Sequence, residues 1–364
     1  MDKKKHYRKL SPSRIGTLSK CTWSYWCNYH LKLPDTGNDG SRRGSIIHDL
    51  YECLIEHIDR HRWKYDMILE KGDAYAVPCV ERFIRMKARQ YELELEKMVV
   101  TKNKKALISN RDYLNEMILV GLQTPFYGLG DGEEIISELA HTLDVDRPEE
   151  GIRYIARGFI DKIFIRRDES GKIIEVEIID YKSSKMKFSG DDLKFNMQGV
   201  IYQLFARDLY PETKKLFFNF LFLQFPRNPW QSVSPLPDKM VKGVEVYLTD
   251  LFHKINNFTE QDAKSYFAKH HGMKHFCGKR GMKTFDDKDL GRVPSPEKNW
   301  MCPHKEPYDY YALVDKDGDV KKTARTEEEL TPTDDLRIIK KHYAGCPAWY
   351  ASKKDLKKFW GAIS

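Results

Sequence analysis

Two acids and a lysine near the middle of the chain have the types and spacing of a hydrolytic metal site. They lie in the segments Gly158-Phe159-Ile160-Asp161 and Ile178-Ile179-Asp180-Tyr181-Lys182. Residues two apart on a strand point to the same face, so Asp180 and Lys182 should converge, and we expect both acids at the exposed ends of adjacent strands. Paired carboxylates suit a hard cation such as Mg²⁺, and the lysine would orient or deprotonate an attacking water and stabilise developing phosphoryl charge.

The helix expected after the second acid adds two polar side chains. Gln198 and Tyr202 are four residues apart, which places them on one face of a helix. An isolated Asp-x-Lys on a strand is usually part of a solvated surface. Here it follows an apolar run, an earlier strand ends in Gly-x-x-Asp, and this helix comes next, so the context favours a functional site.

The first third of the chain should be helical. Apolar residues recur at three- and four-residue spacings from Ser45 to about Arg62, from Val80 to Met98, and from Tyr113 to Leu122. This spacing is typical of amphipathic helices that bury one face.

From Glu133 the pattern changes to that of strands. Apolar and β-branched residues alternate or run together at positions 133–139, 152–165 and 173–181. The segment Arg167–Gly171 predicts a hairpin, because glycine can supply the positive φ that ends such a loop.

The later elements complete an α/β pattern. We expect a helix at 192–209, a strand at 216–225 and a helix at 238–258, followed by a long tail with little periodicity. Loops of that length are usually functional or held by something other than an apolar core. The order of helix, three strands, helix and strand predicts an α/β core with a mixed sheet.

Composition narrows the class of protein. Of the 364 residues, 41% are hydrophobic and 12% aromatic, enough to bury a core, so wholesale disorder is excluded. The formal net charge of +8 favours a polyanionic partner. No apolar signal segment follows the basic amino terminus, no apolar run is long enough to span a membrane, and seven scattered cysteines suit a reducing compartment. These features predict a cytoplasmic protein without a membrane partner.

Five ordered motifs resemble those of the PD-(D/E)XK nuclease superfamily, in its RecB/AddB-like exonuclease branch, which includes CRISPR-associated adaptation nucleases and bacteriophage recombination exonucleases. The resemblance covers roughly Leu10 to Phe225 and implies a restriction-endonuclease-like core: a central mixed β-sheet flanked by helices, with a helical N-terminal region and an irregular C-terminal extension. The motifs are Ser11-Pro12-Ser13 with Cys21 before an aromatic-rich helix, Gly44-x-x-x-His48, Gly158-x-x-Asp161, Asp180-Tyr181-Lys182-Ser183-Ser184-Lys185, and Gln198-x-x-x-Tyr202.

The resemblance implies a role for each matching residue. The implied ligands of Mg²⁺ or Mn²⁺ are His48, Glu138, Asp161, Asp180 and the backbone carbonyl of Tyr181. Glu138 is the best match for the acid on the preceding strand, with Glu134 and Asp144 as alternatives. Lys182 becomes the catalytic lysine beside Asp161 and Asp180, and Gln198 and Tyr202 would contact DNA phosphate or support the active-site strand.

The cysteines suggest a second metal site. In some branches of the family, one early and three late cysteines bind a [4Fe-4S] cluster, and Cys21, Cys277, Cys302 and Cys346 have this order. Cys302 follows Cys277 by 25 residues and Cys346 follows Cys302 by 44 residues, and these intervals are longer than those of the family pattern.

Two other interpretations of the cysteines remain open. A structural Zn²⁺ could use His275 and Cys277 with Cys302 and His304, or the cysteines could be small apolar groups without a metal. Cys53 and Cys79 are predicted to be core residues, and Cys27 is a weaker alternative to Cys21.

The leading hypothesis is a metal-dependent DNA exonuclease of recombination, repair or phage DNA metabolism, in a bacterial or phage-infected cell. Its partners would be DNA and a helicase, a single-strand-binding protein or a recombinase. The alternatives are a structure-selective or CRISPR spacer-processing endonuclease, and a catalytically inactive DNA-binding subunit. We expect residues 1–130 to form the helical part of the nuclease domain, 131–258 the catalytic core and 259–364 a C-terminal extension tied back by a metal site.

Overall fold

The computed structural model describes residues 7–34, 37–101, 106–128, 133–213, 215–265, 277–278, 281–287 and 290–350. The chain divides into two compact units. The first comprises Met1–Pro12, Gly37–Asn256 and Lys283–Glu297, and the second comprises Ser13–Thr36, Asn257–Met282 and Lys298–Ser364. These units do not coincide with the three segments expected from the sequence, because residues 13–36 group with the C-terminal part of the chain.

A five-stranded sheet forms the centre of the first unit. Its strands are β3 (Glu134–Arg147), β4 (Ile152–Arg167), β5 (Ile173–Lys182), β6 (Lys215–Phe222) and β7 (Trp230–Val233), in that spatial order. Only β5 and β6 run parallel, so the sheet is mixed as predicted. The hairpin between β4 and β5 is confirmed: Gly171 has a φ of 84°, and the Asp168 carboxylate accepts from the backbone N–H groups of Ser170 and Lys172.

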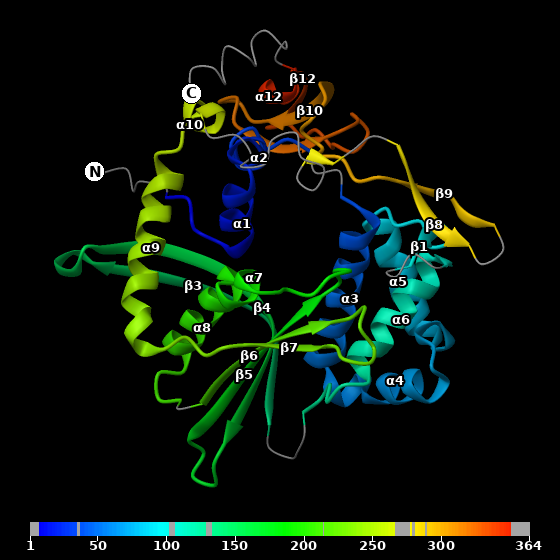
Figure 1. Ribbon diagram of the computed structural model, residues 1–364, viewed down its shortest axis with the longest axis vertical. Helices are drawn as coiled ribbons and strands as arrows, with labels where there is room; N and C mark the ends of the chain where they lie inside the picture. The colour runs from blue at the N-terminus through cyan, green and yellow to red at the C-terminus, as the bar shows by residue number, and fades with distance from the viewer. Residues whose placement is uncertain are drawn as a thin grey trace. The chain divides into compact units, whose positions relative to one another are not determined.

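Helices cover both faces of this sheet (Figure 1). On one side lie α7 (Asp191–Lys194), α8 (Met197–Leu209) and α9 (Asp238–Asn256). On the other side lie α3 (Asp39–Glu56), α4 (Ile58–Lys71), α5 (Pro78–Gln90) and α6 (Asn110–Leu122), with the 3₁₀ turn η1 (Ala74–Ala76). A second 3₁₀ turn, η2 (Pro148–Glu150), joins β3 to β4. This arrangement confirms the predicted α/β fold class.

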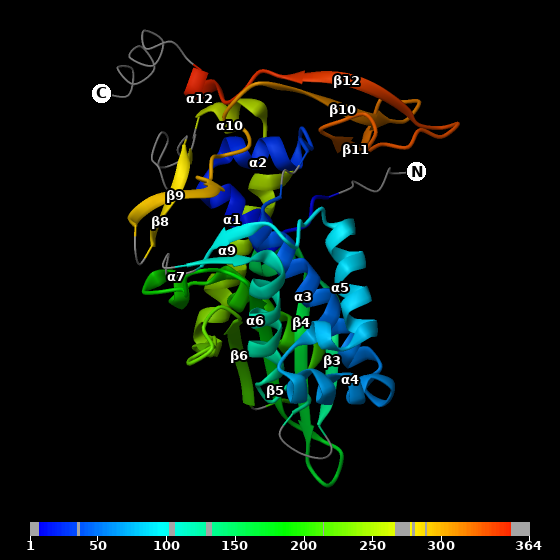
Figure 2. The same ribbon diagram turned by 90° about the vertical axis from the view of Figure 1, so that its right-hand side faces the viewer.

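Helix α3 packs an apolar stripe against the sheet. It buries Ile46, Ile47, Leu50, Tyr51, Leu54 and Ile55. These side chains share one core with Phe164, Ile179, Tyr181 and Leu221 of the sheet. The helix begins earlier than predicted, because Asn38 and Ser41 form a capping box, and it ends at His57 rather than Arg62. Figure 2 shows α3, α5 and α6 beside the strands in a second view.

Several sequence predictions need correction. The helix expected at 80–98 ends at Gln90, and a short pair of strands follows, β1 (Met98–Val100) and β2 (Leu107–Ser109). The helix expected at 192–209 is broken between α7 and α8, because the side chain of Asn196 caps the start of α8 by accepting from Gln198 and Gly199 N–H groups. Strand β7 was not predicted.

The described parts of the C-terminal tail contain regular strands, whereas an irregular extension was predicted. The hairpin β8 (Met282–Asp287) and β9 (Gly291–Lys298) belongs almost entirely to the first unit. The second unit contains an antiparallel sheet of β10 (Tyr308–Val314), β11 (Val320–Ala324) and β12 (Arg337–Tyr343), with β10 in the centre. The helices of this unit are α1 (Pro12–Lys20), α2 (Thr22–Tyr29), α10 (Glu260–Ser265) and α12 (Pro347–Tyr350).

Distant parts of the sequence hold the second unit together. Trp23 of α2 donates from Nε1 to the Tyr343 hydroxyl at 2.8 Å, and that hydroxyl donates to the carbonyl of His304 at 2.8 Å. Thr22 donates to the carbonyl of Ala263. Among the residues described in either unit, no helix combines the length and the apolar composition needed to cross a membrane.

Candidate active site

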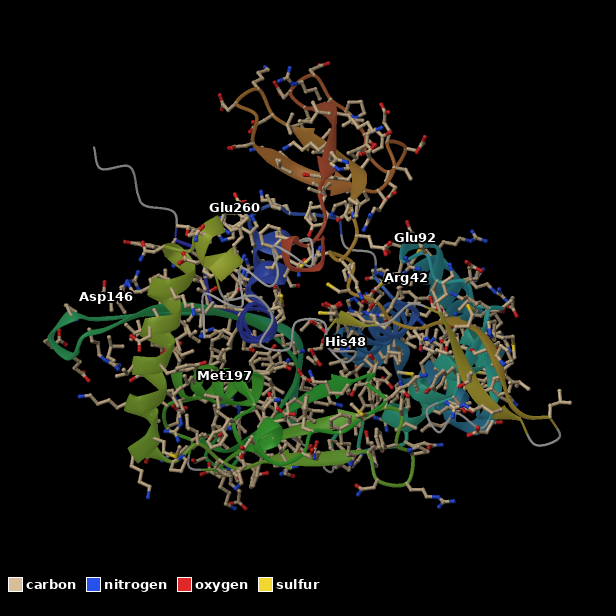
Figure 3. All side chains as sticks on the ribbon, turned by 45° about the horizontal axis from the view of Figure 1, so that its top comes forward. Arg42, His48, Glu92, Asp146, Met197 and Glu260 are labelled. Carbon is tan, nitrogen blue, oxygen red and sulfur yellow. The ribbon has the colours of Figure 1, made fainter. Side chains whose placement is uncertain are left out.

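His48 of α3, Glu138 of β3 and Asp161 of β4 lie together and could hold a metal ion. The Nδ1 atom of His48 lies 3.4 Å from Asp161 Oδ1 and 3.5 Å from Glu138 Oε1. Their potential ligand atoms all lie within 4.8 Å of one another, and in the described part of the chain no other group of three such residues does so. Figure 3 labels His48 on the side of α3 nearest the strands. Carboxylate oxygens are donors that suit Mg²⁺ and Mn²⁺, and imidazole nitrogen is a common ligand of transition metals.

Glu138 owes its position to an unusual backbone. Its φ is 47°, one of three positive values outside glycine in the described residues. The neighbouring pairs Ser137↔Lys162 and Leu139↔Ile160 are regular, so the distortion is confined to Glu138, which lies opposite Asp161. Strain of this kind is concentrated at functional sites.

The alternative acids of β3 are used elsewhere. Glu134 forms an ion pair with Arg167 at 2.9 Å, and Asp144 forms one with Arg153. Of the three acids considered from the sequence, Glu138 is therefore the one beside His48.

Asp161 and Asp180 are not at exposed strand ends, contrary to the prediction. Asp161 is in the middle of β4, next to Lys162, where pairing with β5 begins, and Asp180 is near the end of β5. Because the sheet and its helices cover them, their exposed fractions are 8% and 1%. Asp161 Oδ2 accepts a hydrogen bond from the Tyr181 backbone N–H at 2.7 Å. Because Tyr181 directly follows Asp180, this bond links Asp161 to the main chain beside the second acid.

Lys182 and Gln198 complete the polar cluster around Asp180. Lys182 Nζ lies 2.5 Å from Asp180 Oδ2, and it donates to Gln198 Oε1 at 2.6 Å. The Gln198 amide donates to Asp180 Oδ1 and to the Tyr202 hydroxyl. Tyr202 in turn donates to the backbone carbonyl of Phe159 at 2.5 Å, so the shared face of α8 is held against β4.

Burial and neighbouring charges shift the proton affinities of the cluster. Burial raises the pKa of Asp180 to about 7; the Lys182 ammonium opposes this rise and the Asp161 carboxylate adds to it. Burial alone would lower the pKa of His48, but the carboxylates of Asp161 and Glu138 outweigh it and raise the pKa well above its ordinary value. A cation bound here would have to displace these protons.

Sequence reasoning missed one polar relay that supports the end of β5. The Gln224 amide donates to the carbonyl of Ser183, the residue after Lys182, at 2.5 Å. The Gln224 side-chain oxygen accepts from the hydroxyl of Tyr113 on α6. Gln224 follows an apolar strand without any motif around it, so no sequence signal identifies it.

A buried lysine was also missed. Lys162 is 1% exposed, donates to the carbonyl of Phe126 at 2.9 Å and lies over the rings of Phe126, Phe164 and Tyr181. Burial lowers its pKa to about 7. A single lysine inside the apolar run 159–165 is a signal that could have found it.

Four of the predicted cysteine ligands and Cys27 gather in the second unit. The Cys302 N–H donates to the carbonyl of Cys277. The Lys305 N–H donates to the carbonyl of Cys302, and the Lys305 carbonyl accepts from the Cys346 N–H. Burial raises the pKa of Cys302 to about 11, and the thiols of Cys21 and Cys277 are close enough to raise it further. Cys21 caps α2, where its sulfur accepts from the Ser24 N–H at 3.4 Å.

The zinc alternative gains no support from this geometry. His275 lies outside the described residues, and His304 Nε2 is bonded to Asn28 Oδ1 at 2.7 Å. A tetrahedral zinc site brings its sulfur ligands within about 4 Å of one another. No three cysteine or histidine ligand atoms of the described second unit lie within 4.8 Å. A [4Fe-4S] cluster places each cysteine on a different iron and so accepts wider spacing.

Comparison with known proteins agrees with the fold. Residues 9–278 match the model of the PD-(D/E)XK nuclease superfamily. The chain is 25% identical over 354 residues to a subunit of the ATP-dependent helicase/deoxyribonuclease of Alkaliphilus oremlandii, covering 93% of this chain and 27% of that protein. It is 26% identical over 221 residues to the protein of the same name from Alkaliphilus metalliredigens, covering 57% of this chain and 18% of that protein.

The chain thus spans about a quarter or less of the length of these relatives. The family match covers well over half of the chain and includes every residue of the cluster around His48, Asp161 and Lys182. The chain belongs to the PD-(D/E)XK nuclease superfamily.

Proposed function

We propose that the protein is a divalent-metal-dependent deoxyribonuclease. The observation that carries the proposal is the convergence of His48, Glu138 and Asp161 next to the buried pair of Asp180 and Lys182. A structural ion pair would not need a histidine, three carboxylates and a lysine in one buried cluster. Phosphodiester hydrolysis needs this combination of oxygen and nitrogen ligands with a nearby cation.

The residues would divide the work as follows. His48, Glu138, Asp161, Asp180 and the carbonyl of Tyr181 would hold Mg²⁺ or Mn²⁺, which when bound lowers the pKa of a coordinated water and neutralises phosphate charge. Lys182, held by Asp180 and Gln198 on two sides, orients the attacking water and faces the developing negative charge. Tyr202 keeps α8, and so Gln198, in register with β4.

The biological setting is proposed from the relatives. Their name couples a deoxyribonuclease to an ATP-dependent helicase. We infer that this chain degrades DNA during recombination or repair, from an end, and that a helicase supplies its substrate. The net charge of +8 agrees with a DNA partner.

Cleavage of two DNA forms tests this function. Purified protein with Mn²⁺ or Mg²⁺ should release nucleotides from end-labelled linear DNA, leave covalently closed circles intact and lose activity with a chelator. Cleavage of circles would support the endonuclease instead. Absence of both cleavage and metal binding would support an inactive DNA-binding subunit.

We also propose that Cys21, Cys277, Cys302 and Cys346 hold a [4Fe-4S] cluster. Support comes from their common location in the second unit, from the backbone hydrogen bond between Cys302 and Cys277, and from the proximity of the Cys21 and Cys277 thiols to Cys302. Such a cluster would connect residues 13–36 with the C-terminal strands.

A further inference from the structure

Helix α3 approaches the end of β5 closely because Gly44 has no side chain. A Cβ atom at Gly44 would lie 2.8 Å from Ser183 Oγ and 3.4 Å from Ser183 Cβ. Ser183 directly follows Lys182, and Gly44 precedes His48 by four residues, about one helical turn. One contact therefore joins the helix that carries His48 to the strand that carries Asp180 and Lys182.

Ser183 is held by hydrogen bonds on two sides. Its hydroxyl donates to the carbonyl of Gly40 in α3 at 3.4 Å. On its other side, its carbonyl accepts from Gln224 at 2.5 Å, and Gln224 is bonded to the Tyr113 hydroxyl. Gln224 and Tyr113 are 8% and 4% exposed, so this support is itself buried.

A second close approach holds α3 beyond His48. The Tyr51 hydroxyl donates to the carbonyl of Ile118 in α6 at 2.8 Å, and a Cβ at Gly121 would lie 2.1 Å from that hydroxyl. The Tyr51 ring also packs edge-on against Tyr181 of β5, with centroids 4.8 Å apart. Along α3, His48 lies between the anchors at Gly44 and Tyr51, so a push at Gly44 would change the tilt of α3 at His48.

We propose that Gly44 and Ser183 form a spacing contact that sets the position of His48 relative to Asp161 and Asp180, and that Gly44 is a positioning residue of the metal site. The inference rests on the proposed function, since it concerns that site. A ligand set must be held to within about 0.5 Å. Alanine is otherwise the better helix former, so only the contact with Ser183 makes glycine necessary here.

The experiment compares Mn²⁺ binding to metal-free full-length variants by calorimetry, with circular dichroism to confirm folding. Gly44→Ala should weaken Mn²⁺ binding by about 10- to 100-fold, the range typical of lost support around a metal ligand. Gly243→Ala is the matched control, because Gly243 lies in α9 and has nothing within 4 Å of its Cβ position. It should bind Mn²⁺ as the wild type does.

A double variant distinguishes a change in the spacing between Gly44 and Ser183 from general damage to the fold. Ser183→Ala removes the oxygen that Gly44→Ala would strike, so the double variant should recover most of the affinity that Gly44→Ala loses. Ser183→Val provides a second route, since it crowds Gly44 without changing the helix, and it should also weaken binding.

Two results would overturn the spacing role. One is wild-type affinity in both Gly44→Ala and Ser183→Val, and the other is a loss in Gly44→Ala that the double variant does not recover. If Gly44→Ala fails to fold, Ser183→Val decides between these outcomes. A wild-type protein that binds no Mn²⁺ would instead contradict the proposed function.

Discussion

Lys182 donates a hydrogen bond to Gln198 Oε1 at 2.6 Å, and this contact determines which way the glutamine amide faces. With its oxygen directed at Lys182, its nitrogen donates to Asp180, so one side chain spans the acid and the lysine of the same strand. Gln198 therefore holds the Lys182 ammonium in place through its side chain.

Loss of the Gln198 side chain, which connects Asp180 and Lys182, should slow the chemical step more than it weakens substrate binding. Gln198→Ala leaves Lys182 with the Asp180 carboxylate and the ring of Phe220 as its described contacts, so we expect kcat to fall about 10- to 100-fold with a smaller change in KM. Steady-state kinetics on labelled DNA measure both values. Gln90→Ala, at the exposed end of α5, is the control and should behave as the wild type. An unchanged kcat in Gln198→Ala would remove Gln198 from the site.

Substitution of the acids should separate metal ligands from surface acids. Asp161→Asn and Glu138→Gln each remove a charged donor beside His48, so Mn²⁺ affinity should drop at least about tenfold. Glu134→Gln and Asp144→Asn, whose acids pair with arginines, should leave it unchanged. Calorimetry measures all four variants. Equal losses in the two pairs would show that net charge, rather than ligation, controls binding.

The cysteine proposal predicts a chromophore. Anaerobically purified protein should contain about four irons per chain and show the broad visible absorbance of an iron–sulfur cluster. Cys302→Ala should lose both, because it removes one of the four proposed ligands, the one whose backbone is hydrogen-bonded to Cys277 and Lys305. Cys53→Ala, in α3, should keep both. Stoichiometric zinc without iron in the wild type would contradict the proposal.

Lys162 should make stability depend on pH. Its pKa is about 7 in the folded protein, against about 10.4 in an unfolded chain. Between these values the unfolded state binds one proton more, so stability rises with pH by up to about 1.4 kcal/mol per unit. Lys162→Met keeps the apolar stem and should flatten this rise between pH 7 and 9, as measured by denaturant unfolding. The exposed Lys172→Met should retain the wild-type slope, and an equally steep slope in Lys162→Met would contradict the account.

The local spacing of residues accounts for what could be predicted. Asp180 and Lys182 on a strand, and Gln198 and Tyr202 on a helix, are neighbours because of the period of each element, and the structure brings them together. The neighbouring positions of these strands in the sheet could be predicted for the same reason. Three successive apolar runs, two of them joined by a hairpin, predict adjacent strands. The fold class and the family are confirmed.

Cross-strand and long-range contacts account for what could not be predicted. The choice of Glu138 over Glu134 and Asp144 depends on a positive φ and on arginines of another strand, which no local pattern reveals. The β10–β12 sheet was missed because it is held by contacts such as that of Trp23 with Tyr343, more than three hundred residues away. Its strands are short and carry many charged residues, so their periodicity is weak.

Cleavage by the Lys182→Ala variant measures the contribution of the lysine to hydrolysis. Wild-type protein with Mn²⁺ should degrade end-labelled linear DNA, and Lys182→Ala, folded and with nearly unchanged Mn²⁺ affinity, should be slower by at least about 100-fold. Lys172→Ala, in the exposed turn between β4 and β5, should cleave at the wild-type rate. Full activity in a correctly folded Lys182→Ala variant would contradict the account.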